Sequence, residues 1–333
     1  MTWIATGGHL LSETILEVKN LRTTFRTKAG DVHAVDGISY SITKGRTLGI
    51  VGESGCGKSV TSFSIMGLLE NPGEITGGEI LFKGEKISHL KDEQLLKYRG
   101  QHMAMIFQEP MTALNPVIRI GEQINEQFIK HRPHLSSKEV KEHSIEMLNL
   151  VGIPSPEERY KSYPHQLSGG MRQRALIAMA LSCDPEFLIA DEPTTALDVT
   201  IQAQILDLIQ DLQNRLGMAV QFITHDLGVI SEVADDILVM YAGRVCEQGS
   251  ADEIFKKPSH PYTHALLNSI PKLGHKVHRL PTIEGTVPSI ANRPSGCQFK
   301  NRCEFATDIC GEKQPEFTEI SSTHKVACHH PRS

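Results

Sequence analysis

A glycine-rich segment carries the most specific chemical signal in the chain. Residues 52–59 read Gly-Glu-Ser-Gly-Cys-Gly-Lys-Ser, which fits the pattern G-x-x-x-x-G-K-[ST]. Glycines allow consecutive backbone N–H groups to turn inward, and the positive end of a following helix strengthens their attraction for anions. The Lys58 ammonium suits terminal phosphates, and the Ser59 hydroxyl suits Mg²⁺. We therefore expect a nucleoside triphosphate to bind at Gly52, Glu53, Ser54, Gly55, Cys56, Gly57, Lys58, Ser59 and Val60.

A second signal is a pair of acids at the end of an apolar run. Residues 187–190 read as a buried strand, and Asp191 and Glu192 follow it directly. Parallel strands end at the same edge of a sheet, so we expect Asp191 to ligate Mg²⁺ beside the phosphate loop. Glu192 would then orient the attacking water as a general base. The alternative is an ordinary strand that ends in a solvated acidic turn.

The elements that must position these residues predict an α/β fold. Apolar strands at 48–51, 187–190 and 219–224 alternate with helical segments, which favours a parallel sheet with helices on its faces. Alternating residues from 15 to 42 predict an antiparallel β subdomain, and the stretch of about 110–180 predicts an inserted helical subdomain.

Local patterns add finer expectations. Residues 88–99 predict a short amphipathic helix, and Ser136 with Glu139 forms a capping box ahead of another helix. Residues 236–241 and 244–247 predict a strand pair with a turn between them. Prolines become frequent after 258 and mark a domain boundary. We expect an N-terminal extension at 1–13, a nucleotide-binding domain at 14–258 and a small irregular C-terminal extension at 259–333.

Composition narrows the function classes. The chain has 333 residues and a net charge of −5, with basic and acidic residues interspersed, so no basic face indicates a nucleic-acid partner. No apolar run reaches the ~18–20 residues that a membrane helix needs, and residues 1–11 lack the pattern of a signal peptide. We expect a cytoplasmic protein. In a reducing compartment, the four cysteines crowded into the tail suggest metal before disulfides.

Further motifs give the chain a specific resemblance. Leu167-Ser168-Gly169-Gly170 precedes a small-residue helix, residues 195–198 read Thr-Ala-Leu-Asp, and residues 223–226 read Ile-Thr-His-Asp. With the glycine-rich loop and the acidic pair, they stand in the order and spacing of an ABC-type ATPase subunit. The chain resembles that family over about residues 14–258.

The resemblance implies roles for residues outside the phosphate loop. Ser168, Gly169 and Gly170 would contact the γ-phosphate of ATP bound by the opposite subunit, and Asp198 would lie at the subunit contact. Gln108 would reach Mg²⁺, and His225 would contact the γ-phosphate. By position, Phe25 would stack on adenine, although the family more often has Tyr there and core packing is the alternative. Cys56 is interpreted as a small filler of the loop, against a reactive thiol whose pKa the helix N-terminus lowers.

The tail resembles the C-terminal extension of dipeptide and oligopeptide permease ATPases. The matching segments include residues 260–263, 285–288 and 296–328. In some members of that subfamily an iron–sulfur cluster occupies this region, which implies a [4Fe–4S] cluster on Cys297, Cys303, Cys310 and Cys328. The alternatives are a zinc ion, with His329 and His330 as substitute ligands, or free structural thiols.

Together these observations predict an ATP-hydrolysing motor subunit of an importer for dipeptides or oligopeptides. The resemblance implies ATP and Mg²⁺ as cofactors, a homologous second ATPase as partner, two membrane permeases and an extracytoplasmic peptide-binding protein. The chain would sit at the cytoplasmic face of the membrane as a peripheral subunit. Alternatives are an importer for nickel or another small solute, or a soluble ABC ATPase of DNA repair or translation. A P-loop kinase would have no use for residues 167–170.

Overall fold

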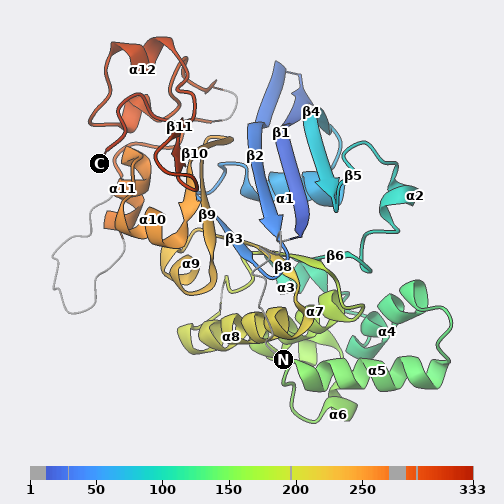
Figure 1. Cartoon of the computed structure of the whole chain (residues 1–333). Coiled ribbons are helices and arrows are strands. Elements are labelled where there is room, and N and C mark those ends of the chain that lie inside the picture. The colour runs from blue at the N-terminus through green and yellow to red at the C-terminus, as the bar shows by residue number, and fades with distance from the viewer. Residues whose placement is uncertain (1–12, 29, 196, 270–282, 290–291, 333) are drawn as a thin grey trace, which may run out of the picture.

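Two sheets organise the chain. The structure is a computed structural model and describes residues 13–28, 30–195, 197–269, 283–289 and 292–332. One sheet has four strands in the order β2-β1-β4-β5, and the other has eight in the order β11-β12-β10-β9-β3-β8-β7-β6. In Figure 1 the four-stranded sheet lies beside the C-terminal extension, and the long helices pack at the opposite end of the molecule. The predicted α/β fold is confirmed.

The four-stranded sheet is antiparallel. Its strands are β1 (Thr14–Thr27), β2 (Gly30–Thr43), β4 (Gly73–Phe82) and β5 (Glu85–Lys86). Alternation along β1 buries Leu16, Val18 and Leu21 against the apolar side of the larger sheet. This is the expected result for a sheet with one face on the core and one in water.

The larger sheet is parallel at its centre. Strands β3 (Thr47–Val51), β6 (Met103–Ile106), β7 (Phe187–Asp191), β8 (Ala219–Thr224) and β9 (Asp236–Tyr241) form the parallel part. Ile50 joins one hydrophobic core and Val51 the other, so β3 is buried on both faces. Such burial explains why β3 reads as a continuous apolar run instead of an alternating one.

Helices cover the sheet and build the inserted subdomain. Around the larger sheet lie α1 (Lys58–Met66), α8 (Val199–Leu216), α9 (Leu227–Val233) and α10 (Ala251–Lys256). Helix α2 (Asp92–Leu95) lies beyond β5, beside the four-stranded sheet (Figure 1). The helical stretch contains α3 (Pro110–Ala113), α4 (Ile120–His131), α5 (Ser137–Leu150), α6 (Pro156–Tyr160), η1 (Pro164–Gln166) and α7 (Gly169–Leu181). The predicted capping box is present at α5, where Ser136 Oγ accepts from the Glu139 N–H.

One local prediction was wrong in extent. The helix expected at 88–99 is limited to α2, because the chain turns immediately after it. The Arg99 guanidinium donates to the Met66 and Gly67 carbonyl oxygens at the end of α1, and Tyr98 packs edge-on against Phe82. These long-range contacts require a turn that overrides the local helical pattern.

The tail joins the larger sheet. Strand β10 (Arg244–Ser250) pairs antiparallel with β9, and β12 (Lys325–Val326) and β11 (Thr318–Glu319) continue the sheet beyond it. The extension also contains α11 (Pro261–Asn268), η3 (Lys300–Arg302) and α12 (Asp308–Glu312). Strands β11 and β12 could not be expected from local sequence patterns, because each is only two residues long.

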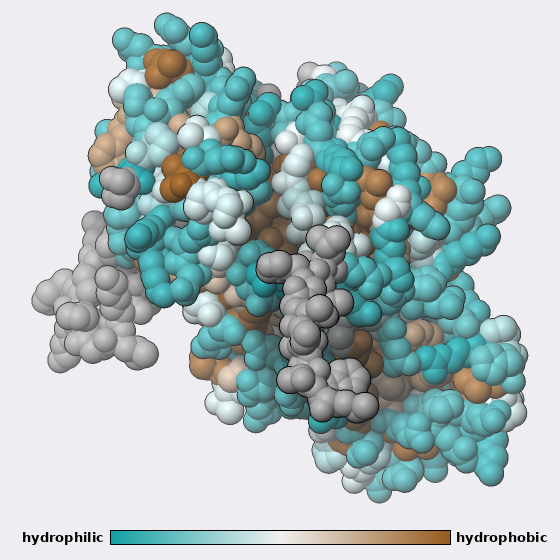
Figure 2. Space-filling model, in the orientation of Figure 1, coloured by the Kyte–Doolittle hydropathy of each residue, from teal (hydrophilic) through white to brown (hydrophobic). Residues whose placement is uncertain are grey.

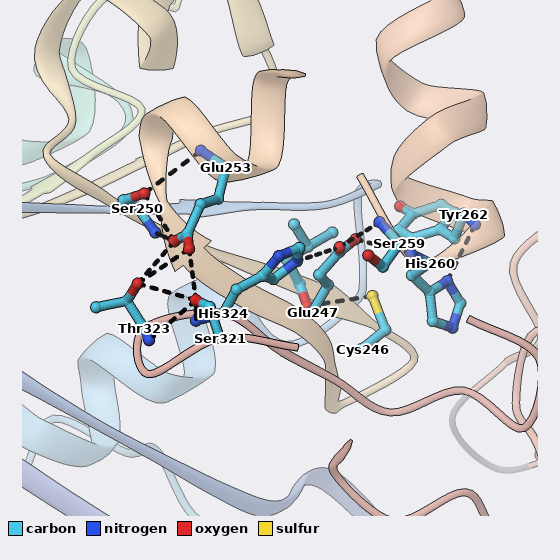
Figure 3. Close-up of polar contacts among 11 residues, drawn as sticks. Cys246, Glu247, Ser250, Glu253, Ser259, His260, Tyr262, Ser321, Thr323 and His324 are labelled. Carbon is cyan, nitrogen blue, oxygen red and sulfur yellow. Dashed lines mark hydrogen bonds and ion pairs between the residues drawn. The ribbon is translucent and has the colours of Figure 1, made fainter. Parts of the chain in front are cut away.

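Buried polar contacts attach the extension to the sheet. Glu247 on β10 is fully buried and accepts hydrogen bonds from the Ser259 and His260 N–H groups and from His324. Figure 3 shows Glu247 between His324 on one side and the segment leading into α11 on the other. Because an unpaired buried carboxylate would be costly, the Ser259 and His260 N–H groups hold the start of α11 in place, and His324 attaches the segment that leads into β12.

Within the described residues, none of the helices is both long enough and apolar enough to cross a bilayer. The face in Figure 2 is mostly hydrophilic, with apolar side chains in small separate patches.

Candidate active site

The phosphate loop joins β3 to α1 at the carboxyl edge of the parallel strands. Two of its glycines have no room for a side chain. A Cβ on Gly52 would lie 2.2 Å from the Met240 carbonyl oxygen, and one on Gly57 would lie 2.6 Å from that of Ala34. Both have positive φ, at 155° and 103°. Only glycine satisfies both constraints, so the loop can wrap its backbone N–H groups around an anion.

Lys58 lies inside the loop. Its side chain is 5% exposed, and its Nζ donates to the Gly52 carbonyl oxygen at 2.7 Å and to that of Glu53 at 3.2 Å. The ammonium is therefore held against the start of the loop backbone, where its charge can attract phosphate oxygens.

Asp191 fits the predicted Mg²⁺ site. It ends β7, is 2% exposed, and its buried Oδ1 has no hydrogen-bond partner within the described structure. Burial raises its pKa to about 6, while a hydrogen bond from the Ser59 hydroxyl opposes that rise. A buried, unpartnered carboxylate oxygen beside a serine hydroxyl is a suitable donor set for a hard cation.

Glu192 is the meeting point of several predicted site residues. Its carboxylate accepts hydrogen bonds from Gln108 Nε2 at 2.9 Å and from Thr195 Oγ1 at 2.9 Å, and it lies 3.2 Å from His225 Nδ1. Burial acts to raise its pKa, but the hydrogen bonds from His225 and Thr195 outweigh it and hold the pKa below the usual value. Glu192 is therefore ionised at neutral pH, as a group that accepts a proton or orients water must be.

These side chains border one cavity of about 510 Å³. The size suits a nucleotide. The cavity is lined by the start of the phosphate loop, by Glu192 with its hydrogen-bond partners, and by Leu266 of α11, which was not among the predicted site residues. The lining residues are Val51, Gly52, Glu53, Ser54, Gln108, Glu192, Thr195, His225, Leu227 and Leu266.

Other predicted residues lie outside this lining. Ser168 caps α7 by accepting from the Met171 N–H, and a Cβ on Gly170 would come 2.8 Å from Ile201 Cγ2. Asp198 caps α8 by accepting from the Ile201 N–H. Neither these residues nor Gly169 is among the described residues that border the cavity. Their predicted action on a second subunit's nucleotide stays a prediction.

Phe25, the predicted adenine contact, is also not among the described residues that border the cavity. Phe25 pairs with Val32 across β1 and β2, and a Cβ on Gly73 would come within 2.8 Å of its ring. The side chain is half-buried. Stacking on adenine stays a prediction, beside the alternative of packing against β4.

Cys56 is buried within the phosphate loop. The residue is fully buried, and burial raises the pKa of its thiol more strongly than nearby Lys58 lowers it. This burial favours the interpretation of Cys56 as a filler over the alternative of a thiol activated by the helix N-terminus, and the interpretation stays a prediction.

The four distal cysteines surround one small cavity. Cys297, Cys303, Cys310 and Cys328 line it together with His260, His329 and His330, and all four are free thiols. Burial raises the pKa of Cys297, Cys303 and Cys328, the last to about 11. Across the described residues, no three His, Cys, Asp or Glu side chains stand in an arrangement that could hold a metal ion. The donor chemistry fits soft metals, but the geometry gives no support to a cluster.

Comparisons with known proteins agree with this architecture. Residues 35–195 match the ABC transporter family, and residues 246–310 match the oligopeptide/dipeptide transporter C-terminal region. The dipeptide transport ATP-binding protein DppD of Lactococcus lactis is 51% identical over 315 residues, covering 95% of this chain and 90% of its own. DppD of Bacillus subtilis is 50% identical and covers 95% and 94%. The Bacillus subtilis oligopeptide transport ATP-binding protein AppD is 49% identical and covers 95% and 96%.

Solved structures show the same core. The dimeric post-hydrolysis state of the ATP-binding cassette MJ0796, bound to ADP and Pi, superposes with a TM-score of 0.65 at 28% identity and covers 71% of this chain and 99% of its own. The cassette cbiO1 from Clostridium perfringens, part of the ABC transporter complex cbiONQ, has a TM-score of 0.63 at 28% identity, covering 74% and 92%.

Fold and site thus define an ABC-type ATPase, which uses ATP and Mg²⁺ and works with membrane permeases. More narrowly, the chain belongs to the family of ABC transporter ATP-binding proteins that carry the oligopeptide/dipeptide transporter C-terminal region.

Proposed function

We propose that this chain is the motor subunit of an importer for dipeptides or oligopeptides. The observation that carries the proposal is the convergence of Gln108, Glu192 and His225 on a cavity that the phosphate loop borders, in a chain whose tail matches the peptide-transporter C-terminal region. Its relatives at about half identity are themselves described as dipeptide and oligopeptide transport proteins.

The chemistry proposed for the site follows from the roles of its side chains. The loop N–H groups and Lys58 bind the phosphates, while Ser59, Asp191 and Gln108 would hold Mg²⁺, which supplies charge neutralisation when bound. Glu192 accepts a hydrogen bond from the attacking water and orients it toward the γ-phosphorus. His225 would donate a hydrogen bond to the γ-phosphate, and its contact with Glu192 fixes the position of the two side chains relative to each other.

The site is proposed to be completed by a second subunit. Ser168, Gly169 and Gly170 of one ATPase would contact the γ-phosphate bound by the other, with Asp198 at the contact between them. The N-terminus of a helix such as α7 is suited to bind an anion. No described residue of the α7 N-terminus borders the cavity at the phosphate loop of its own chain, so the anion would come from another subunit. We propose a related ATPase as this partner. The two ATPases would sit at the cytoplasmic face of the membrane and drive two membrane permeases, which receive peptide from an extracytoplasmic binding protein.

Co-expression with the membrane permeases of a peptide importer tests this function. We expect the complex to hydrolyse ATP and to take up labelled dipeptides, with nickel and unrelated small solutes excluded. Uptake of nickel without peptide would favour the small-solute alternative. A chain that hydrolyses ATP alone and never associates with permeases would favour a soluble ABC protein instead.

We propose separately that the four distal cysteines bind a [4Fe–4S] cluster. The support is the donor chemistry: four free thiols line one cavity, and thiolates are the ligands such clusters use. The spacing of these side chains in the described residues is not that of a metal site. Anaerobic purification should yield a brown protein with about four iron and four sulfide per chain, and Cys303→Ser should reduce both. Zinc at one ion per chain would favour the zinc alternative, and a colourless, metal-free protein would leave the thiols structural.

A further inference from the structure

An ion pair connects the C-terminal extension directly to the phosphate loop. Arg302 NH1 lies 2.6 Å from Glu53 Oε2, and Arg302 NH2 lies 3.0 Å from Glu53 Oε1. The two parallel contacts make the pair bidentate, which is the strong geometry for guanidinium and carboxylate. The Arg302 side chain is 4% exposed and that of Glu53 is 30% exposed. This contact joins residues that are 249 positions apart in the chain.

The rest of the Arg302 guanidinium is also bound. Its Nε donates to the Glu284 carbonyl oxygen at 2.9 Å, and NH2 donates to that of Ile283 at 3.2 Å. NH1 lies 3.4 Å from the Tyr241 hydroxyl. A guanidinium with this many partners has one orientation, so its charge is fixed against the phosphate loop.

A second contact holds the same point of the loop. The Glu53 N–H donates to the Tyr262 hydroxyl at 3.0 Å, and Tyr262 is fully buried. Tyr262 lies in the first turn of α11, whose start is held by the hydrogen bonds of Glu247 that Figure 3 shows. Backbone and side chain of Glu53 are thus both bound by the extension.

The position of Glu53 makes its charge important for nucleotide binding. Glu53 borders the same cavity as Gly52, Ser54 and His225. An unpaired carboxylate there would repel the triphosphate, because Coulomb repulsion is only weakly screened in a partly buried site. Paired with Arg302, the same carboxylate is locally neutral.

We propose that Arg302 is a positioning residue of the ATP site: by neutralising Glu53 and holding it in place, the C-terminal extension allows the phosphate loop to bind a triphosphate tightly. This inference rests on the proposed role of the loop in ATP binding. It gives the extension a direct part in nucleotide affinity, in addition to any part in transport.

Opposite substitutions in the pair separate charge from packing. Arg302→Gln leaves the Glu53 carboxylate unpaired, so we expect the Kd for ATP with Mg²⁺ to rise by roughly tenfold. Glu53→Gln leaves Arg302 unpaired beside the phosphates, so the Kd for ATP should stay the same or fall. The double variant should bind ATP within about twofold of the wild type, because both charges are gone.

Isothermal titration calorimetry on the full chain measures these values. Affinity for AMP should change by less than about twofold in Arg302→Gln, since AMP lacks the terminal phosphates that meet the loop. Arg332→Gln is the matched control, because Arg332 is an arginine of the same extension that stacks on Phe305. It should leave the Kd for ATP unchanged. Thermal unfolding checks that each variant is folded.

Each outcome decides the proposal. Equal ATP affinity in Arg302→Gln and wild type overturns it. So does a Glu53→Gln variant whose Kd for ATP is roughly tenfold above that of the wild type, since the pair would then act by packing alone. This comparison with the wild type does not need Arg302→Gln to fold. Lys58→Ala is the reference for the loop itself. If wild type and Lys58→Ala bind ATP equally, the proposed ATP site fails, whatever Arg302 does.

Discussion

Glu192 holds an uncommon backbone conformation for a residue with a side chain. Its φ is 47°, in the left-handed region, and its N–H donates to the Ile223 carbonyl oxygen at 2.8 Å. Such a conformation costs about 1–3 kcal/mol and persists only where surrounding contacts fix it. The contacts with Gln108, Thr195 and His225 provide that constraint and aim the carboxylate into the cavity.

Replacing Glu192 by glutamine tests its proposed role. The amide keeps the size of the side chain but cannot take up a proton, so ATP binding should persist while turnover falls by about 10²–10³-fold. Binding by calorimetry and phosphate release by the assembled transporter measure the two effects. Normal phosphate release by the assembled mutant would refute the assignment.

Gly57 offers a second prediction about a single residue. Alanine there would meet the Ala34 carbonyl oxygen at 2.6 Å in a backbone conformation with φ of 103°, so Gly57→Ala should cost about 2 kcal/mol or more of unfolding free energy and remove ATP binding. Gly45→Ala is the control, because Gly45 has φ of 72° with no atom within 4 Å of the added Cβ. We expect Gly45→Ala to lower the free energy of unfolding by about 1 kcal/mol and to retain ATP binding. Equal losses in denaturant titrations would contradict the steric argument.

The residues with a local chemical signature were predictable. The phosphate loop and the Asp191–Glu192 pair show their chemistry in residue type and spacing, and the structure brings both to the carboxyl edge of the sheet. Arg302, Tyr262 and Leu266 were not predictable, because their importance comes from contacts with a loop more than two hundred positions away. Nothing in the sequence around Arg302 distinguishes it from other arginines in the tail.

At the scale of elements, long periodic segments were predictable and short ones were not. The capping box at Ser136 works because its contacts lie within one turn of helix. The helix expected at 88–99 was cut short because Arg99 and Tyr98 have partners on α1 and β4. Strands β11 and β12 depend on the exposed edge of β10, which a local pattern cannot reveal.

Glu253 provides a test of how the tail is attached. It belongs to α10, and its carboxylate accepts from the hydroxyls of Ser250, Ser321 and Thr323. The hydrogen bond from Ser321 leads the interactions that lower its pKa from 4.5 to about 2. The folded state therefore favours the carboxylate, whose stabilisation is complete above pH 4.5 and is lost as the pH falls toward 2.

Glu253→Gln should lower the free energy of unfolding at pH 7. Because the side chain is partly open to solvent, we expect a loss of only about 1 kcal/mol. Urea titrations at pH 7 and at about pH 3.5 should show the difference between wild type and variant shrinking at the lower pH. A difference that grows on acidification would contradict the assignment. Asp252→Asn is a suitable control, since Asp252 pairs with Lys256 one turn away on the exposed side of α10.

At the scale of the molecule, the phosphate loop, the acidic pair and the C-terminal extension form one connected unit. The loop follows β3 near the centre of the large sheet. The extension continues that sheet at one edge and returns to bind Glu53. The α/β class was predictable from alternating strands and helices. The return of the tail to the loop was not, because the order of motifs along a chain does not say which surfaces meet.

The central claim is that ATP turnover by this chain powers peptide import, and peptide-stimulated ATP hydrolysis tests it most directly. The chain, its partner ATPase and the permeases would be reconstituted in vesicles with the peptide-binding protein, and phosphate release measured with and without dipeptide. The account predicts that dipeptide raises phosphate release and that labelled peptide accumulates only with ATP, with both effects lost in Glu192→Gln. ATP hydrolysis that no peptide changes, together with peptide uptake that does not need ATP, would contradict it.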